Sequence, residues 1–244
     1  MNELEIPFFM DGALRIAQGK GYRAGMDACL LAAAIQVQGA KQVLELGSGV
    51  GTALLCAAWR NKSASFVGIE KQSHLAKLAM DNITRNQLDN QVQVKQGDIA
   101  DLAAIIARDS VDHVFFNPPF QDDASKGNIP AKGRDTAFVA DASGLGVWIA
   151  QGISVLKSRG YMTLIHRAEY VDEILSLLKP VCGDIHILPI LPRAGNNAHR
   201  VLVRGRKGSR ATATLCAPFV LHENDKQHTD LADAILRGKQ ALVF

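Results

Sequence analysis

The stretch that decides the fold of this chain reads Val43-Leu44-Glu45-Leu46-Gly47-Ser48-Gly49-Val50-Gly51-Thr52. Apolar residues at its start predict a buried strand, its glycines predict a tight turn, and a helical pattern follows to residue 60. Glycine is needed where the backbone bends sharply and approaches a ligand without a Cβ atom. A dinucleotide-binding loop would place its third glycine at position 52, but this chain has Thr52 there and Gly51 before it. The stretch therefore predicts a strand, a ligand-binding turn and a helix, and leaves the ligand open.

Alternating strand and helix patterns extend outward from this stretch almost to the end of the chain. Strands are predicted at residues 42–46, 65–70, 91–96, 113–117, 161–166, 184–191 and 200–204. Helices are predicted at residues 51–60, 73–88, 143–156, 169–178 and 229–237. Such alternation is typical of an α/β fold with a mostly parallel sheet and helices on both faces. The last strands follow one another without a long crossover, which predicts an antiparallel edge on this seven-stranded sheet.

Composition places the chain among soluble globular proteins. Its 244 residues, 48% of them hydrophobic, suffice for a sizeable core, and no linker or repeat divides them. We expect one domain, with a cover segment at 1–40, a core at 41–205 and an extension at 206–244. No apolar run approaches the roughly 20 residues that span a bilayer, and no export signal is visible, so we expect a cytoplasmic protein. As a separate expectation, we favour a monomer. The four cysteines form no C-x-x-C pair, which predicts neither a disulfide framework nor a zinc site.

Polar side chains follow the next three predicted strands, each at the point where the strand ends. Glu70 ends the second strand, Asp98 follows the third and Asn117 follows the fourth. Ligands of open α/β sheets bind beyond the carboxyl ends of the strands, so these side chains and the glycine loop should converge on one crevice. A carboxylate at the position of Glu70 can accept hydrogen bonds from both hydroxyls of a ribose. The alternative for each acid alone is an ordinary cap or turn residue.

The fourth strand runs into Asn117-Pro118-Pro119-Phe120. Two prolines remove two backbone N–H donors, and a residue before proline is pushed toward extended geometry. The carbonyls near Asn117 and Pro118 then remain available to a ligand, and with the Asn117 side-chain oxygen they make acceptors suited to an NH₂ group. Phe120 offers a ring face for stacking. The segment predicts a site for a planar amine, the alternative being a strand that simply stops at a Pro-Pro turn.

This ordered set of motifs resembles the class I S-adenosylmethionine-dependent methyltransferases, and N-P-P-F resembles the signature of their amino-methylating branch. The resemblance covers about residues 21–205 and implies a Rossmann-like fold, S-adenosyl-L-methionine as the cofactor and no metal. It implies that the glycine loop and the following strand ends bind the cofactor, with Glu70 on its ribose and Asp98 on its adenine amine. The residues so implied are Glu45, Gly47, Gly49, Gly51, Glu70, Asp98, Ile99 and Asn117. The implied catalytic residues are Asn117, Pro118, Pro119 and Phe120.

The flanking segments indicate which amine is methylated. Residues 21–33, which include Arg23 and Asp27, and residues 218–223 look like the bacterial tRNA adenine-N6 methyltransferase group that acts on a valine tRNA. Asp27 stands near a predicted helix start, where a carboxylate can accept hydrogen bonds from unpaired N–H groups. The alternative is that this helix start lies over the crevice, and then Arg23 and Asp27 join the cofactor-binding residues.

Two other methyl acceptors stay open. N-P-P-F is common in rRNA guanine-N2 methyltransferases, which usually carry a duplicated second domain. Release-factor glutamine methyltransferases share N-P-P-Y but place a helical domain before the glycine loop.

Six cations without an acid between residues 193 and 210 could contact RNA phosphates or merely cover a solvated hairpin. Lys126, Lys132 and Arg134 lie after Phe120 in a predicted lid beside the target base. We expect a tRNA substrate and no membrane partner.

Overall fold

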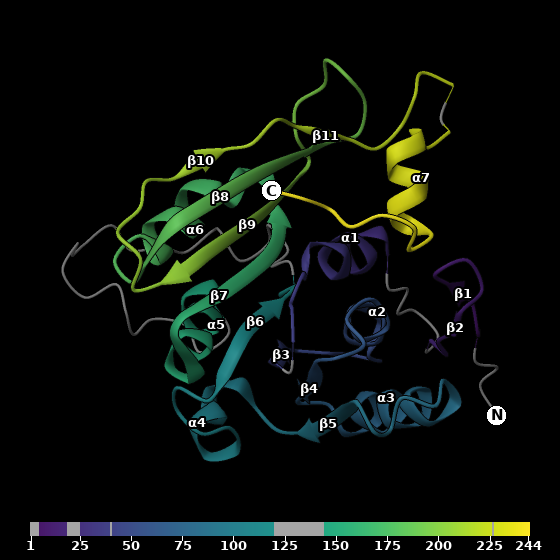
Figure 1. Ribbon diagram of the computed structural model, residues 1–244, viewed down its shortest axis with the longest axis vertical. Coiled ribbons are helices and arrows are strands. Elements are labelled where there is room, and N and C mark those ends of the chain that lie inside the picture. The colour runs from purple at the N-terminus through teal and green to yellow at the C-terminus, as the bar shows by residue number, and fades with distance from the viewer. Residues whose placement is uncertain (1–4, 19–24, 40, 120–143, 226) are drawn as a thin grey trace, which may run out of the picture.

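The computed structural model describes residues 5–18, 25–39, 41–119, 144–225 and 227–244. Its centre is a nine-stranded sheet with the order β10-β8-β9-β7-β6-β3-β4-β5, to which β11 adds beside β8 (Figure 1). The strands of this sheet are β3 (Gln42–Leu46), β4 (Ser65–Glu70), β5 (Val92–Gln96), β6 (Val111–Phe116), β7 (Leu156–Arg167), β8 (Cys182–Leu191), β9 (Arg200–Lys207), β10 (Thr214–Leu215) and β11 (Phe219–Val220). A separate hairpin joins β1 (Phe8–Phe9) to β2 (Leu14–Arg15).

The predicted fold class is confirmed, with differences in the number and bounds of the strands. β7, β6, β3, β4 and β5 run parallel, and β9 pairs in antiparallel fashion with both β7 and β8. The sheet has nine strands rather than seven, because β10 and β11 pair parallel to β8. Each of these is only two residues long, which is too short for an alternating pattern to be seen in the sequence. β7 also begins at Leu156, the residue at which the preceding helix was predicted to end.

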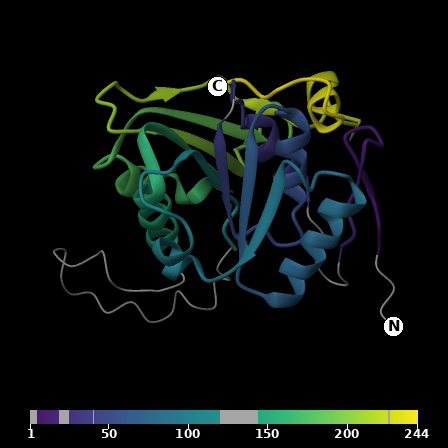
Figure 2. The ribbon, with the colours of Figure 1, turned by 60° about the horizontal axis from the view of Figure 1, so that its bottom comes forward.

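Helices cover both faces of the sheet (Figures 1 and 2). One hydrophobic core contains residues of α1 (Met26–Ala34), α2 (Thr52–Arg60), α3 (Ser73–Arg85) and α7 (Asp230–Leu236). The other contains residues of α4 (Leu102–Ile105), α5 (Leu145–Val155) and α6 (Val171–Leu178). Short 3-10 turns at Ile99–Asp101 and Ala168–Tyr170 lead into α4 and α6. None of the helices in the described ranges is long and apolar enough to cross a membrane.

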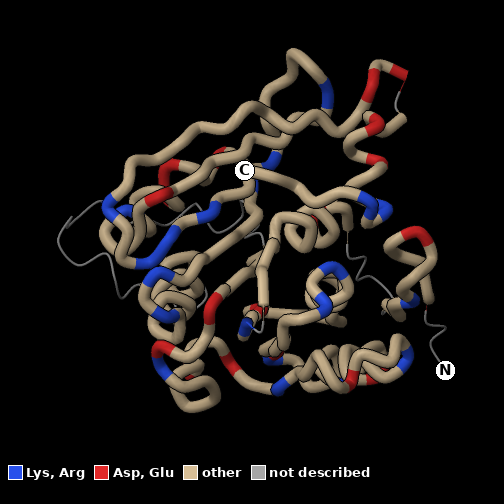
Figure 3. Tube along the Cα trace, in the orientation of Figure 1, with Lys and Arg blue, Asp and Glu red and all other residues tan. Residues whose placement is uncertain are grey.

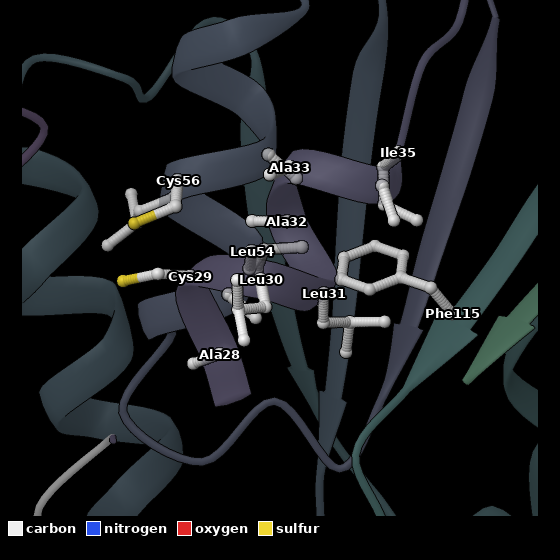
Figure 4. Packing of buried hydrophobic residues seen from close by; sticks show 14 of the residues in the cluster. Ala28, Cys29, Leu30, Leu31, Ala32, Ala33, Ile35, Leu54, Cys56 and Phe115 are labelled. Atoms are coloured by element: carbon white, nitrogen blue, oxygen red, sulfur yellow. The ribbon is translucent and has the colours of Figure 1, made fainter. Parts of the chain in front are cut away.

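Alternation along each strand divides its side chains between the two cores. Phe115 packs with the core of α1 and α2, whereas Phe116 packs with the core of α5. α1 is buried over the consecutive residues Ala28 to Ala34, and Figure 4 shows Ala28 to Ala33 near Leu54 and Cys56 of α2 and near Phe115. The thiols of Cys29 and Cys56 lie in this contact as small core residues, as predicted. Burial on every side explains why the sequence of α1 is apolar from Ala28 to Ala34 rather than amphipathic.

Candidate functional site

The register of the parallel strands brings the predicted site residues to one edge of the sheet. β3 ends at Leu46, which pairs with Phe116 of β6 and with the residue before Glu70 in β4. One step further along the strands, Gly47, Glu70 and Asn117 therefore stand side by side at the carboxyl edge. The predicted convergence of the glycine loop with an acid and an amide follows directly from this pairing.

The glycine loop requires glycine for two separate reasons. Gly47, Gly49 and Gly51 have φ values of 64°, 54° and 87°, a region in which a Cβ atom is strained. At Gly47 a Cβ atom would also lie 2.4 Å from the ring of Trp148, so packing excludes a side chain there as well. Gly51 is the N-cap of α2. The predicted sequence of strand, turn and helix is confirmed, and the Trp148 ring packs against the backbone of the turn at Gly47.

Glu70 is a buried carboxylate that shapes the glycine loop. It is only 6% exposed. Its Oε2 accepts a hydrogen bond from the Gly49 N–H at 2.8 Å, and its Oε1 accepts one from the Gln72 N–H at 2.8 Å. A carboxylate has about four lone-pair sites, so two acceptor sites remain beyond these bonds. Holding the loop is a role that the sequence does not predict, and it is compatible with the predicted contact to ribose hydroxyls.

Four buried oxygen atoms at or near this row have no hydrogen-bond partner among the described residues. They are Oε2 of Glu45 in β3, Oγ of Ser48, Oγ1 of Thr52 and Oδ1 of Asn117. Burial raises the pKa of the Glu45 carboxyl well above its usual range; a hydrogen bond from the Leu54 backbone opposes this, and the charge of Glu70 adds to it. Unsatisfied buried oxygens are costly and mark places where a ligand can supply the donor. The lone acceptor of Asn117 fits the predicted amine site.

The neighbours of Asn117 differ in their surroundings. Pro118 is buried and Pro119 is exposed, so the chain turns outward directly after the strand. Phe120 lies outside the described residues, as do Lys126, Lys132 and Arg134 of the predicted lid. The stacking role of Phe120 and the lid therefore stay predictions.

Asp98 follows β5 and begins a 3-10 turn at the same edge. Its Oδ1 accepts a hydrogen bond from the Ala100 N–H at 3.0 Å, and its Oδ2 pairs with Lys71 at 2.8 Å. The Lys71 ammonium, followed by the Ala100 N–H, holds the pKa of Asp98 below its usual value. Ile99 packs against the core of α5. Asp98 is thus a charged cap in the expected place, and its contact with an adenine amine stays a prediction.

Asp27 does not cap α1, so the capping alternative is wrong, whereas its predicted contact with the cofactor stays a prediction. The N-cap residue is Gly25, without any side-chain cap, and Oδ2 of Asp27 accepts a hydrogen bond from Nε of Arg200 at 2.8 Å. The carboxylate joins the start of α1 to the start of β9, and a partner 173 residues away could not be inferred from a local pattern. The other candidate of this segment, Arg23, lies outside the described residues.

The basic block at residues 193–210 does not form one patch. Arg200 pairs in register with Arg167 at the carboxyl edge, whereas Arg206 pairs with Tyr161 nearer the amino edge. The Arg204 guanidinium packs over Phe244, with 4.4 Å from Cζ to the ring centroid. Figure 3 shows cationic and acidic residues interspersed along the described part of the trace. Contact with RNA phosphates by the whole block is not supported by this arrangement.

Trp148 is a residue of the site region that has no signal in the sequence. It lies on α5, is 8% exposed, and contacts both the glycine loop and Phe116 at the carboxyl end of β6. Nothing in the local sequence distinguishes it from any apolar residue of a helix. Within the described ranges, no group of three or more His, Cys, Asp or Glu side chains is arranged to hold a metal ion.

A family model described as a methyltransferase domain matches residues 38–203. The chain belongs to the methyltransferase domain family. A curated relative of this methyltransferase, the tRNA1(Val) (adenine(37)-N6)-methyltransferase of Bacteroides thetaiotaomicron, is 24% identical over 204 residues, covering 81% of this chain and 82% of the relative. The enzyme of the same name from Aeromonas hydrophila is 27% identical and covers 85% and 86%. A solved structure of a predicted O-methyltransferase from Agrobacterium tumefaciens matches with a TM-score of 0.74 and 27% identity, covering 88% of this chain and 98% of that one.

S-adenosyl-L-methionine is the cofactor of this methyltransferase, as predicted. The described residues fit such a group. The turn at Gly47 to Gly51 carries no side chain at its three glycines, Glu70 keeps acceptor sites for hydroxyls, and Glu45 holds a buried oxygen without a partner. These features lie at the carboxyl edge, where ligands of parallel α/β sheets bind.

Proposed function

We propose that this methyltransferase transfers a methyl group to the exocyclic N6 amine of an adenine in tRNA. The observation that carries the proposal is Oδ1 of Asn117, a buried acceptor without a partner among the described residues, at the strand end beside the glycine loop. The curated relatives named tRNA1(Val) (adenine(37)-N6)-methyltransferase, which match over most of their length, support the same substrate.

The residues at this edge suit the chemistry of an aromatic amine. Such a nitrogen is a poor nucleophile because its lone pair is delocalised into the ring. Acceptors at Asn117 Oδ1 and at the backbone carbonyls beside it would hold both N–H groups and direct the lone pair, so positioning supplies much of the acceleration. When bound, S-adenosyl-L-methionine supplies an electrophilic methyl group on its sulfonium. The amine proton can leave after the transfer, so no strongly basic side chain is needed.

A hydroxyl acceptor is the main competing target, because one solved neighbour is titled a predicted O-methyltransferase. A hydroxyl has one hydrogen to donate, whereas an NH₂ group has two. A pair of acceptors built from a side-chain oxygen and a backbone carbonyl matches the amine better. An rRNA guanine amine or a release-factor glutamine would present the same NH₂ group, and the experiment must separate these from adenine.

The decisive experiment is mass spectrometry of nucleosides and proteins from cells with and without this gene. We expect N6-methyladenosine to disappear from one purified tRNA species and to return when the purified enzyme and cofactor are added to that tRNA. Loss of N2-methylguanosine from rRNA, or of methylglutamine from a release factor, would overturn the proposed substrate while leaving the methyltransferase intact.

A further inference from the structure

Trp148 supports two strand ends that carry different parts of the proposed site. Its Cη2 and Cζ3 atoms would lie 2.4 Å and 2.9 Å from a Cβ atom at Gly47, so the far end of the indole rests on the glycine-loop backbone. The same ring packs against Phe116, with 5.6 Å between the ring centroids. Phe116 immediately precedes Asn117. One rigid side chain thus touches the loop that borders the cofactor and the base of the amine-binding segment.

The helix that carries Trp148 also holds the third strand-end segment of the site. One turn further along α5, Nε2 of Gln151 donates a hydrogen bond to the Ala100 carbonyl at 3.1 Å, in the 3-10 turn that Asp98 begins. Ile99 of that turn packs against the same core. α5 therefore connects three of the strand ends to which the sequence assigns cofactor or substrate contacts.

We propose that Trp148 is a positioning residue, which sets the spacing between the glycine loop and Asn117 and thereby aligns the target amine with the methyl donor. The inference rests on the proposed amine site at Asn117. An indole is a large, rigid, planar ring system, so beyond its two side-chain torsions it spans the gap between the two strand ends without internal flexibility. Gly47 has no side chain that could fill the space left by a smaller residue at position 148. Misplacement of reacting groups by about 1 Å can cost about 100-fold in rate, so a small shift between the two strand ends would be felt in catalysis before binding.

The second tryptophan of the chain offers a matched control. Trp59 at the end of α2 rests on Gly238, another glycine with positive φ, where a Cβ atom would lie 2.7 Å from Cζ3 and 3.2 Å from Cη2 of that ring. Gly238 lies beyond α7, outside the row formed by Gly47, Glu70 and Asn117. Trp148→Phe and Trp59→Phe therefore remove the same indole atoms from above a left-handed glycine, and only the first glycine belongs to the site.

The test compares the two variants in single-turnover methyl transfer at saturating tRNA and cofactor. We expect Trp148→Phe to lower the rate about 10-fold or more while its affinity for S-adenosylhomocysteine stays within about threefold, since alignment is lost before binding. Trp59→Phe should keep the wild-type rate, with thermal unfolding showing how much each variant is destabilised. Equal rates for the two variants would overturn the assignment and make Trp148 ordinary core packing.

A second measurement does not depend on the substrate or on a Trp148 variant that folds. Trp59→Phe leaves Trp148 as the single tryptophan, so its emission reports on the support of the glycine loop. We expect S-adenosylhomocysteine to shift or quench this emission, and an unchanged spectrum at saturation would count against the contact. If the wild-type enzyme methylates no tRNA, the proposed substrate is wrong, yet the emission experiment still decides whether Trp148 is coupled to the cofactor site.

Discussion

At the scale of single residues, the site is defined by polar atoms that the fold leaves without partners. Oδ1 of Asn117 and Oε2 of Glu45 are buried and unsatisfied among the described residues, while both oxygens of Glu70 are already engaged by backbone N–H groups. Buried acceptors without donors cost stability, so they persist where a ligand repays the cost. Removing the Asn117 amide should therefore affect methyl transfer, whereas removing the Glu70 carboxylate should affect cofactor binding and the stability of the loop.

Asn117→Ala should separate catalysis from cofactor binding. The amide oxygen is proposed to hold the reacting amine, whereas the glycine loop, Glu70 and Asp98 are predicted to hold most of the cofactor. Loss of one positioned acceptor should remove about 3 to 4 kcal/mol of transition-state stabilisation, or about 10² to 10³ in rate. Single-turnover transfer measures the rate, and calorimetry with S-adenosylhomocysteine serves as the control for binding. A variant that keeps more than half of the wild-type rate would mean that Asn117 merely ends a strand.

Glu70→Ala should weaken cofactor binding and also loosen the glycine loop. The carboxylate accepts hydrogen bonds from Gly49 and Gln72 in the protein itself, and charged hydrogen bonds are worth about 1.5 to 3 kcal/mol each. Calorimetry should show lower affinity for S-adenosylmethionine, and thermal unfolding without cofactor should show a lower midpoint. An unchanged affinity would refute the ribose assignment, whereas an unchanged midpoint would refute only the role in the loop.

His113 should make the protein sensitive to acid. Its ring is buried, with Nε2 2.9 Å from Oγ1 of Thr163, and burial, assisted by the charge of Arg204, lowers its pKa to about 3. Between about pH 6.5 and 3 the unfolded chain binds a proton at this ring and the folded chain does not. The free energy of unfolding is therefore unaffected by His113 above about pH 6.5 and falls as the pH is lowered toward 3. The free energy of unfolding should fall by up to about 1.4 kcal/mol per pH unit from this group. His113→Gln should show a flatter dependence in urea titrations, and parallel curves would contradict the assignment.

At the scale of elements, α3 holds the N-terminal segment against the glycine loop through two asparagines one turn apart. Asn82 is fully buried and exchanges hydrogen bonds with the N–H and carbonyl of Ala17, and it also donates to the Val50 carbonyl. Asn86 makes the same reciprocal pair with Arg15 near the surface. The two residues have the same side chain, Asn82 within α3 and Asn86 at its C-cap, and they differ in burial.

Asn82→Ala should therefore be far more destabilising than Asn86→Ala. The first leaves three buried backbone groups unpaired, each costing about 1 to 3 kcal/mol, for a total of about 3 kcal/mol or more. Water can replace the second side chain, so the cost there should stay near 1 kcal/mol. Urea unfolding under matched conditions measures both. Equal losses would show that burial does not decide the strength of this clamp.

Much of this architecture could be predicted because the relevant signals are local. Each site residue stands at the end of its own strand: the glycines at 47, 49 and 51 after β3, Glu70 at the end of β4 and Asn117 after β6. Parallel pairing of these strands then brings the residues together. β10 and β11 were missed because two-residue strands have no periodicity. The contact of Trp148 with Gly47 depends on tertiary packing, for which the chain carries no local pattern.

At the scale of the whole molecule, strand direction decides which cations can approach a substrate at the carboxyl edge. Arg206 and Arg200 stand on the same strand, six positions apart, and pair with Tyr161 and Arg167. At about 3.3 Å per residue they are separated by about 20 Å along β9. Arg206 also stacks its guanidinium at 5.3 Å from the Tyr161 ring and donates to the Arg159 carbonyl. A run of cations that is continuous in sequence is thus divided between two edges of the fold.

Arg206→Gln should consequently leave tRNA binding unchanged. A cation on a phosphate contributes about 0.7 to 0.9 to the slope of log affinity against log salt concentration, and its loss would be visible in a titration between 50 and 200 mM salt. If the amine to be methylated reaches Asn117 as proposed, the bound RNA should lie over the carboxyl edge. Arg206 stands about 13 Å from that row toward the amino edge. Glutamine preserves a donor for the Arg159 carbonyl and most of the side-chain length, so folding should not be disturbed. A slope that drops by about one phosphate contact would place RNA at the amino edge as well, and the enzyme would then wrap its substrate around the sheet instead of meeting it at one edge.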